Sequence, residues 1–121
     1  NTQNARELLE LLDAGQVRSV VFLCSCYFQK ACPREFEILR AGLAVRQQTV
    51  VATRTHAKIL AAELTDGRQI VVESSANLRS CRNIEQLVMT ESPDLGRFHR
   101  QWIDEVVRQW QTKQPPATLA A

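Results

Sequence analysis

Hydrophobic residues in the first part of the chain follow first a helical and then a strand-like pattern. Between Asn4 and Asp13, leucines recur with helical spacing around acidic residues, and Gly15 follows as a stop signal. Residues 18–28 contain an uninterrupted apolar run, which is typical of a strand buried on both faces. We therefore expect a surface helix capped by Asn4, followed by a strand in the centre of a sheet.

A second helix and a second strand are predicted next. Pro33 suits the first turn of a helix over residues 34–45, where large apolar residues recur on one side. Residues 48–54 are rich in valine and threonine, which favour a strand. The order strand, helix, strand predicts a parallel pair joined by a right-handed crossover.

The remaining part of the chain opens with a predicted hairpin. A strand that begins at Thr55 meets a turn at residues 65–67, whose glycine can adopt positive φ, and residues 69–72 return antiparallel beside it. Residues 84–90 form a further apolar stretch that can return to the sheet. The last helix is predicted over residues 93–111, with an apolar stripe along one side.

These elements predict one α/β domain over residues 1–111, built as a mixed β-sheet flanked by helices on both faces, with a flexible tail over residues 112–121. The composition agrees, because 45% hydrophobic and 23% charged residues in a chain of 121 describe an ordinary soluble domain. No apolar run is long enough to span a bilayer, and the opening segment lacks the pattern of a signal peptide. A cytoplasmic protein that does not bind membranes is therefore expected.

The cysteine pattern argues against a metal centre. The four cysteines, Cys24, Cys26, Cys32 and Cys81, have a spacing that fits no zinc-finger pattern. A disulfide framework is unexpected in a cytosolic protein, so reduced and partly buried thiols are favoured. We expect neither a metal nor a cofactor.

Candidate chemistry is concentrated around the predicted hairpin. Side chains two apart in a strand point to the same face, so His56 and Lys58 should share one surface. The returning strand brings Ser75 and Asn77 back to the same end, and Glu85 follows a few residues later. A lysine and an amide can hold the non-bridging oxygens of a phosphodiester, and a neutral imidazole can attack phosphorus.

The segments HAK, SSAN and RNIE resemble the signature of the phospholipase D superfamily, His-x-Lys followed by Gly/Ser-Ser-x-Asn and often by Asn-x-Glu. The resemblance implies that His56 is the nucleophile and that Lys58 and Asn77 bind phosphate. It implies that Ser75 donates a supporting hydrogen bond and that Glu85 is the carboxylate that orients the imidazole. It also implies a phospholipase D-like α/β fold.

In this superfamily one histidine forms a phosphohistidine while a second protonates the leaving oxygen, without a divalent metal. The chain carries one such motif, so the resemblance implies a homodimer in which two copies of His56 share one active site. The net charge of +2 does not by itself predict nucleic-acid binding, but Arg54, Arg79 and Arg82 lie in or beside the motif and favour nucleic acid over phospholipid. The prediction is a metal-independent phosphodiesterase or nuclease, of the small single-motif type found in bacteria and their phages.

Two departures from the signature suggest a function of a different class. Glu63 stands at the position of the family's Asp, and Glu73 precedes the serines where the family has a glycine pair. The alternative is a DNA-binding or assembly module that keeps the fold and has lost turnover. In a regular strand Glu63 points away from the His56 face, so it is given no catalytic role.

The candidate residues also have purely structural interpretations. His56 would then be a structural histidine, and Lys58 a charge that protects an edge strand. Ser74, Ser75 and Asn77 would be turn formers, because such side chains readily bind local backbone.

Similar alternatives apply to the residues that follow. Glu85 would be a solvated charge paired with a nearby arginine. On the last helix, His99 is expected at the surface, and Trp102 and Trp110 in the core or at a subunit contact.

Overall fold

The computed structural model describes residues 2–76 and 84–113. Over these ranges it is an α/β structure with four helices, a two-stranded parallel sheet and a three-stranded antiparallel sheet, so the predicted α/β class is confirmed. The chain divides into two compact units. They comprise residues 1–58 with 74–86, and residues 59–73 with 87–121.

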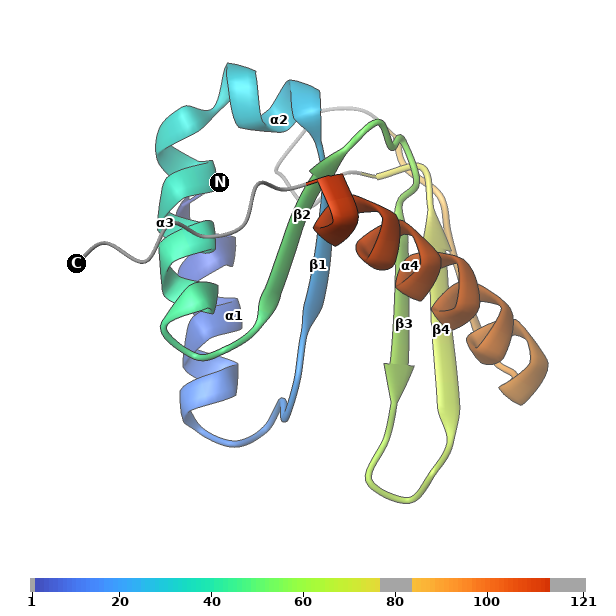
Figure 1. Ribbon diagram of the computed structural model, residues 1–121. Helices are drawn as coiled ribbons and strands as arrows, with labels where there is room; N and C mark the ends of the chain where they lie inside the picture. Colours follow the sequence, from blue (N-terminus) through green and yellow to red (C-terminus); the bar gives the residue numbers. More distant parts are fainter. Residues whose placement is uncertain (1, 77–83, 114–121) are drawn as a thin grey trace. The chain divides into compact units, whose positions relative to one another are not determined.

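The first unit contains a parallel strand pair with helices packed against it. Its elements are α1 (Thr2–Asp13), β1 (Val21–Ser25), α2 (Cys26–Ala31), α3 (Pro33–Ala44) and β2 (Thr49–Thr53). The strands β1 and β2 pair in parallel, as predicted, from Val21 opposite Thr49 to Ser25 opposite Thr53. Figure 1 shows α1 and α3 side by side, and α3 packs against β2.

Helix α3 supplies much of the buried core of the first unit. Its Phe36, Leu39 and Leu43 are buried, and their spacing places them on one stripe of the helix. Val51 in β2 is completely buried as well. Because burying such a side chain contributes about 1.5–3 kcal/mol, this packing holds β2 firmly in place. His56 follows β2 after a short segment.

Polar side chains join the ends of these elements. Gln48 accepts a hydrogen bond from the N–H of Val20 at 2.6 Å and donates to the carbonyl of Arg46 at 2.8 Å. Arg46 also forms an ion pair with Asp13 at the end of α1, with Nη2 and Oδ2 2.6 Å apart. The hydrogen bond from Arg46 holds the pKa of the Asp13 carboxyl below its ordinary value. These contacts tie the start of the strand pair and the end of α1 to the segment after α3.

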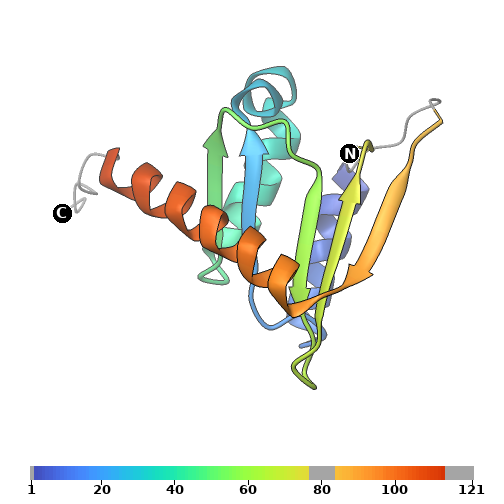
Figure 2. The ribbon, with the colours of Figure 1, turned by 90° about the vertical axis from the view of Figure 1, so that its right-hand side faces the viewer.

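The second unit is an antiparallel sheet with one long helix. Its elements are β3 (Ile59–Glu63), β4 (Gln69–Ser74), β5 (Leu87–Glu91) and α4 (Pro93–Lys113). The strand order is β3-β4-β5, and Figure 2 shows the three strands side by side. Strands β3 and β4 pair from Ile59 opposite Glu73 to Glu63 opposite Gln69.

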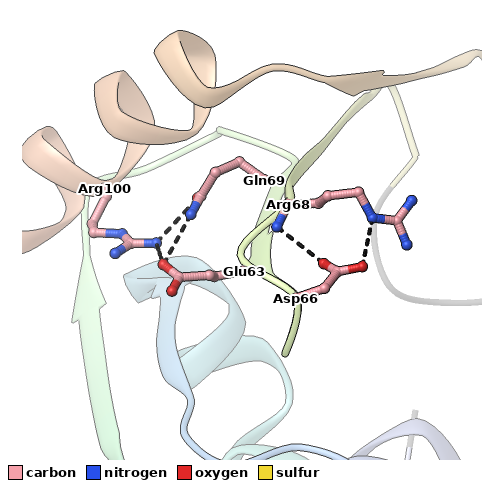
Figure 3. A network of polar contacts seen from close by, with 5 residues as sticks. All are labelled: Glu63, Asp66, Arg68, Gln69 and Arg100. Atoms are coloured by element: carbon pink, nitrogen blue, oxygen red, sulfur yellow. Dashed lines mark hydrogen bonds and ion pairs between the residues drawn. The ribbon is translucent and has the colours of Figure 1, made fainter.

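The turn between β3 and β4 lies where the sequence predicts it. Gly67 has φ of 87°, which glycine adopts without steric cost, and its N–H donates to the carbonyl of Leu64 at 2.9 Å. The carboxylate of Asp66 accepts hydrogen bonds from the backbone N–H of Arg68 at 3.1 Å and from its Nε at 2.8 Å (Figure 3). These bonds hold the pKa of Asp66 below its ordinary value. The turn returns β4 to the end of β3 that follows Lys58.

Helix α4 is joined to the hairpin by a polar network (Figure 3). Nη2 of Arg100 lies 2.7 Å from Oε2 of Glu63 and 3.1 Å from Oε1 of Gln69. The side-chain amide of Gln69 in turn donates to Glu63 at 2.9 Å. Glu63 therefore contributes to the packing of α4 against the hairpin.

The strand pairing differs from the predicted arrangement. One mixed sheet was expected, but hydrogen bonds group the described strands into two sheets. The sheets are separate because the chain leaves the strand conformation between β2 and β3. Within the described residues β1 is one of two strands and not the centre of a larger sheet, and only its Cys24 is buried. The prediction of a central strand buried on both faces is therefore wrong.

Several boundaries also differ. The helix α2 replaces the end of the predicted first strand, because the side chain of Ser25 caps that helix by accepting from the N–H of Tyr27 at 3.0 Å. Asn4, predicted to precede the helix as its cap, lies inside α1. Of the predicted tail, residues 112–113 belong to α4 and the rest lies outside the described residues. The single domain over residues 1–111 stays a prediction.

None of the helices in residues 2–76 and 84–113 combines the length and the apolar character that crossing a membrane requires.

Candidate active site

His56 and Lys58 lie in the segment that connects β2 to β3 and not on the strand predicted for them. That prediction is wrong because Thr55 offers local hydrogen bonds that replace the sheet ladder. Its N–H donates to the carbonyl of Thr53 at 3.0 Å, and its hydroxyl accepts from the N–H of Ala57 at 3.2 Å. The segment is therefore held by its own turn-like bonds.

The side chains of His56 and Lys58 nevertheless meet, which confirms that they share one surface. Nζ of Lys58 lies 3.1 Å from Nδ1 and 3.3 Å from Nε2 of His56, and it donates to the backbone carbonyl of His56 at 2.9 Å. The side chain of His56 is exposed and that of Lys58 is half-buried. An imidazole and an ammonium are thus presented together to solvent.

The ammonium of Lys58 lies over the face of the imidazole ring. Nζ of Lys58 is nearly equidistant from the two ring nitrogens of His56. An atom in the plane of the ring at those distances would overlap a ring carbon, so Nζ lies above the plane. The nitrogen lone pair lies in the ring plane, so a donor above the ring meets it at a poor angle. Lys58 therefore places a positive charge beside His56 without capping the lone pair that a nucleophile needs.

Strand β4 brings Ser74 to the same segment. The N–H of Ser74 donates to the carbonyl of Lys58 at 3.0 Å, which extends the pairing of β3 with β4 by one residue. The hydroxyl of Ser74 accepts from the N–H of Ala76 at 2.8 Å and lies 3.2 Å from the carbonyl of Gln86, to which it donates. One residue thus joins three segments of the chain.

Ser75 and Glu85 contact each other. The hydroxyl of Ser75 donates to Oε2 of Glu85 at 2.5 Å and accepts from the N–H of Gln86 at 3.0 Å. The N–H of Ser75 donates to the carbonyl of Gln86 at 2.9 Å. The contact predicted between Glu85 and the ring of His56 is not among the hydrogen bonds of the described residues. The roles of Ser75 and Glu85 toward a phosphate stay predictions.

Of the predicted phosphate-binding arginines, the structure describes Arg54. It lies in the bend after β2, and its side chain is exposed. Asn77, Arg79 and Arg82 lie outside the described residues, as does Cys81. The structure thus brings together His56 and Lys58, and it joins the backbone of Lys58 to the serine pair, all within the first unit.

No protein-family model, no curated protein and no solved structure matches the chain. The function therefore has to be inferred from the chemistry of His56, Lys58 and the serines.

The described cysteines are free thiols, Cys24, Cys26 and Cys32. In residues 2–76 and 84–113, no three or more His, Cys, Asp or Glu side chains form a group that could hold a metal ion. Cys24 is buried with its Sγ 3.6 Å from the carbonyl of Val51, and burial raises the pKa of its thiol to about 11. At neutral pH this sulfur is a protonated thiol, which is a poor nucleophile.

A polar cluster that sequence reasoning missed lies in the second unit. His99 is only 3% exposed, so its predicted surface position is wrong. Its Nε2 lies 3.2 Å from Oε1 of Glu73, and its Nδ1 accepts from the indole N–H of Trp102 at 2.9 Å. Because the indole N–H can only donate, the neutral ring carries its proton on Nε2 and donates it to Glu73.

A signal for the burial of His99 was present in the sequence. Leu95, His99, Trp102 and Val106 follow one another at spacings of three and four residues, which places His99 within the apolar stripe of α4. Trp102 and Trp110 are both half-buried. The position of His99 within the apolar stripe thus indicated that it is buried, whereas its polarity suggested a surface position.

Proposed function

We propose that this protein is a metal-independent phosphodiesterase or nuclease that acts on nucleic acid through a phosphohistidine at His56, like the phospholipase D superfamily that its motif resembles. The observation that carries the proposal is the ammonium of Lys58 over the ring of His56 at an exposed surface. The imidazole of His56 can then act as the nucleophile, and the ammonium of Lys58 beside it can bind the phosphate oxygens. The proposal includes a phospholipase D-like fold, supported by the α/β class and by the hairpin after His56 and Lys58.

The proposed reaction has two steps. The unprotonated nitrogen of His56 attacks phosphorus, so that a P–N bond forms and the bond to the leaving oxygen breaks. The ammonium of Lys58 offsets the negative charge on the non-bridging oxygens, and an acid protonates the leaving oxygen. Water then attacks phosphorus, the P–N bond breaks, and the proton of the water passes to the group that acted as the acid.

The acid in this proposal is the His56 of a second copy. The chain has one other histidine, His99, and both of its ring nitrogens are engaged by Glu73 and Trp102 in a buried position. A homodimer with both copies of His56 near a two-fold axis supplies the missing group. One imidazole of the pair then acts as the nucleophile and the other as the acid.

Nucleic acid is the proposed substrate because arginines accompany the motif. Arg54 is exposed two residues before His56, and Arg79 and Arg82 follow the serine pair in the sequence. Contacts from arginine and lysine to phosphates supply most non-specific affinity for nucleic acids.

Nicking of supercoiled plasmid in EDTA tests the proposal. Wild-type protein is expected to nick, and His56→Ala to lower the rate at least about a hundredfold because it removes the nucleophile. Lys58→Ala should lower the rate about ten- to a hundredfold by removing one charge from the transition state. The exposed Lys30 of α2 provides a matched control, and Lys30→Ala should leave the rate unchanged.

The covalent intermediate gives a second readout. A radiolabelled oligonucleotide should form an acid-labile adduct with the wild-type protein and none with His56→Ala. Nicking that persists in His56→Ala, or that disappears from the wild-type protein when EDTA removes divalent metals, would contradict the proposal.

One observation favours the second candidate, a DNA-binding or assembly module without turnover. The hydroxyl of Ser75 is already engaged by Glu85 and the backbone of Gln86, so it is not aimed at a ligand. A gel shift with duplex DNA, in the absence of any nicking, would support this module in place of the enzyme.

A further inference from the structure

A hydroxyl that the proposed reaction does not use lies where three segments of the candidate site meet. The backbone of Ser74 binds the carbonyl of Lys58, while its side chain binds the N–H of Ala76 and the carbonyl of Gln86. The first segment carries His56 and Lys58. The second carries Ser75, and the third carries Glu85 with Gln86.

The two serines have different tasks in this arrangement. Among the described residues, the hydroxyl of Ser75 binds the third segment, at Glu85 and Gln86. The hydroxyl of Ser74 binds both the turn at Ala76 and the third segment, and the N–H of the same residue binds the first. Removing the Ser74 hydroxyl therefore loosens Ala76 and Gln86 while leaving the backbone bond to Lys58 in place.

We propose that Ser74 is a positioning residue, which sets where the segment with His56 and Lys58 lies relative to the segments with Ser75 and Glu85. This inference rests on the proposed function. Catalytic groups must be held to within a fraction of an ångström of the productive geometry, and side chains near a site achieve this through hydrogen bonds to neighbouring backbone. The hydrogen bonds of Ser74 go to backbone groups of Lys58, Ala76 and Gln86, so it acts through its neighbours.

Nicking kinetics with three variants at Ser74 test the inference. Ser74→Ala should lower kcat about tenfold and change KM less than about twofold, because alignment is lost and substrate binding is kept. Ser74→Thr keeps the hydroxyl and should restore kcat. Ser74→Cys keeps the shape with a weaker hydrogen-bonding group and should give an intermediate kcat, which keeps the test usable if Ser74→Ala fails to fold.

Ser92→Ala is the matched control. The hydroxyl of Ser92 accepts from the N–H of Leu95 at 3.2 Å at the start of α4, so this variant loses a bond similar to that of Ser74 with Ala76. It should leave kcat unchanged. Amide hydrogen exchange of Ala76, measured by NMR, should become faster in Ser74→Ala and stay unchanged in Ser92→Ala.

The outcomes separate this inference from the proposed function. The positioning role is supported if Ser74→Ala lowers kcat and speeds the amide exchange of Ala76, and if Ser74→Thr restores kcat. An active wild-type protein whose kcat is unchanged in Ser74→Ala, or a kcat that threonine does not restore, overturns the positioning role alone. A wild-type protein without any nicking in EDTA overturns both.

Discussion

The two histidines of the chain show how far neighbours decide the role of a residue. His56 is exposed with the ammonium of Lys58 over its ring, whereas His99 is buried between Glu73 and Trp102. The first contact joins residues two apart, and the sequence predicted that they share a surface, although the strand on which that prediction rested does not form at these residues. The contact of His99 with Glu73 depends on which face of α4 packs against the hairpin. The sequence indicates that face only through the apolar stripe of α4.

At the residue scale, Cys24 provides a prediction about pH. Only the thiolate is alkylated, and a pKa of about 11 leaves roughly one Cys24 thiol in a thousand ionised at pH 8. Because the pKa is raised, the thiolate forms only as the pH rises toward that value. Cys24 should therefore resist iodoacetamide at pH 8 and react faster as the pH increases, as measured by peptide mass spectrometry.

The half-buried Cys26 and Cys32 are internal references for this measurement. Both should be labelled before Cys24 in the folded protein, and all three should react in urea. Labelling of Cys24 at the same rate as Cys26 in the native state would refute the burial of its sulfur.

At the element scale, spacing predicted helix α3, strand β2 and the turn at Gly67 because each depends on nearby residues. The chain after β2 was predicted less well. Thr55 binds local backbone there, and Ser25 in the same way caps α2 where a longer strand was expected. Small polar side chains that compete for backbone bonds are the common cause of these errors.

Two helical glycines allow close packing of their helices, and they provide a prediction about stability. A Cβ at Gly96 of α4 would lie 2.9 Å from Cβ of Gln69, whereas at Gly42 of α3 it would meet the flexible end of Leu9. Gly96→Ala should lower the free energy of unfolding by about 1–2 kcal/mol, because overpacking outweighs the gain in helix propensity. Gly42→Ala should cost less, because the leucine can rotate away.

Urea denaturation followed by circular dichroism measures both changes. The exposed Gln101 of α4 serves as the control, and Gln101→Ala should stay within about 0.5 kcal/mol of the wild-type value. A Gly96→Ala variant more stable than the wild-type protein would show that α4 does not pack closely on Gln69.

At the scale of the whole molecule, the proposed mechanism requires two chains. A shared site is active only if both copies carry His56, because one acts as nucleophile and the other as acid. If wild-type and His56→Ala chains are refolded together in equal amounts, about one quarter of random dimers are wild-type on both sides. The nicking rate should therefore fall to about a quarter of that of an all-wild-type sample.

Independent sites would give about half the rate, and that result would rule out a shared site. Light scattering on the same samples measures the mass of the assembly, and an affinity tag on the variant chain confirms that mixed dimers form. A monomeric chain that still nicks DNA would also contradict the shared site.

By itself, the sequence determined helices α1, α3 and α4, the hairpin turn and the nearness of His56 to Lys58, because these follow from the spacing and chemistry of near neighbours. Only the tertiary structure decided that the strands form two sheets, that Ser75 binds Glu85, and that His99 is buried against Glu73. Those features depend on contacts between residues ten or more positions apart, and spacing along the chain does not encode which of the possible contacts will form.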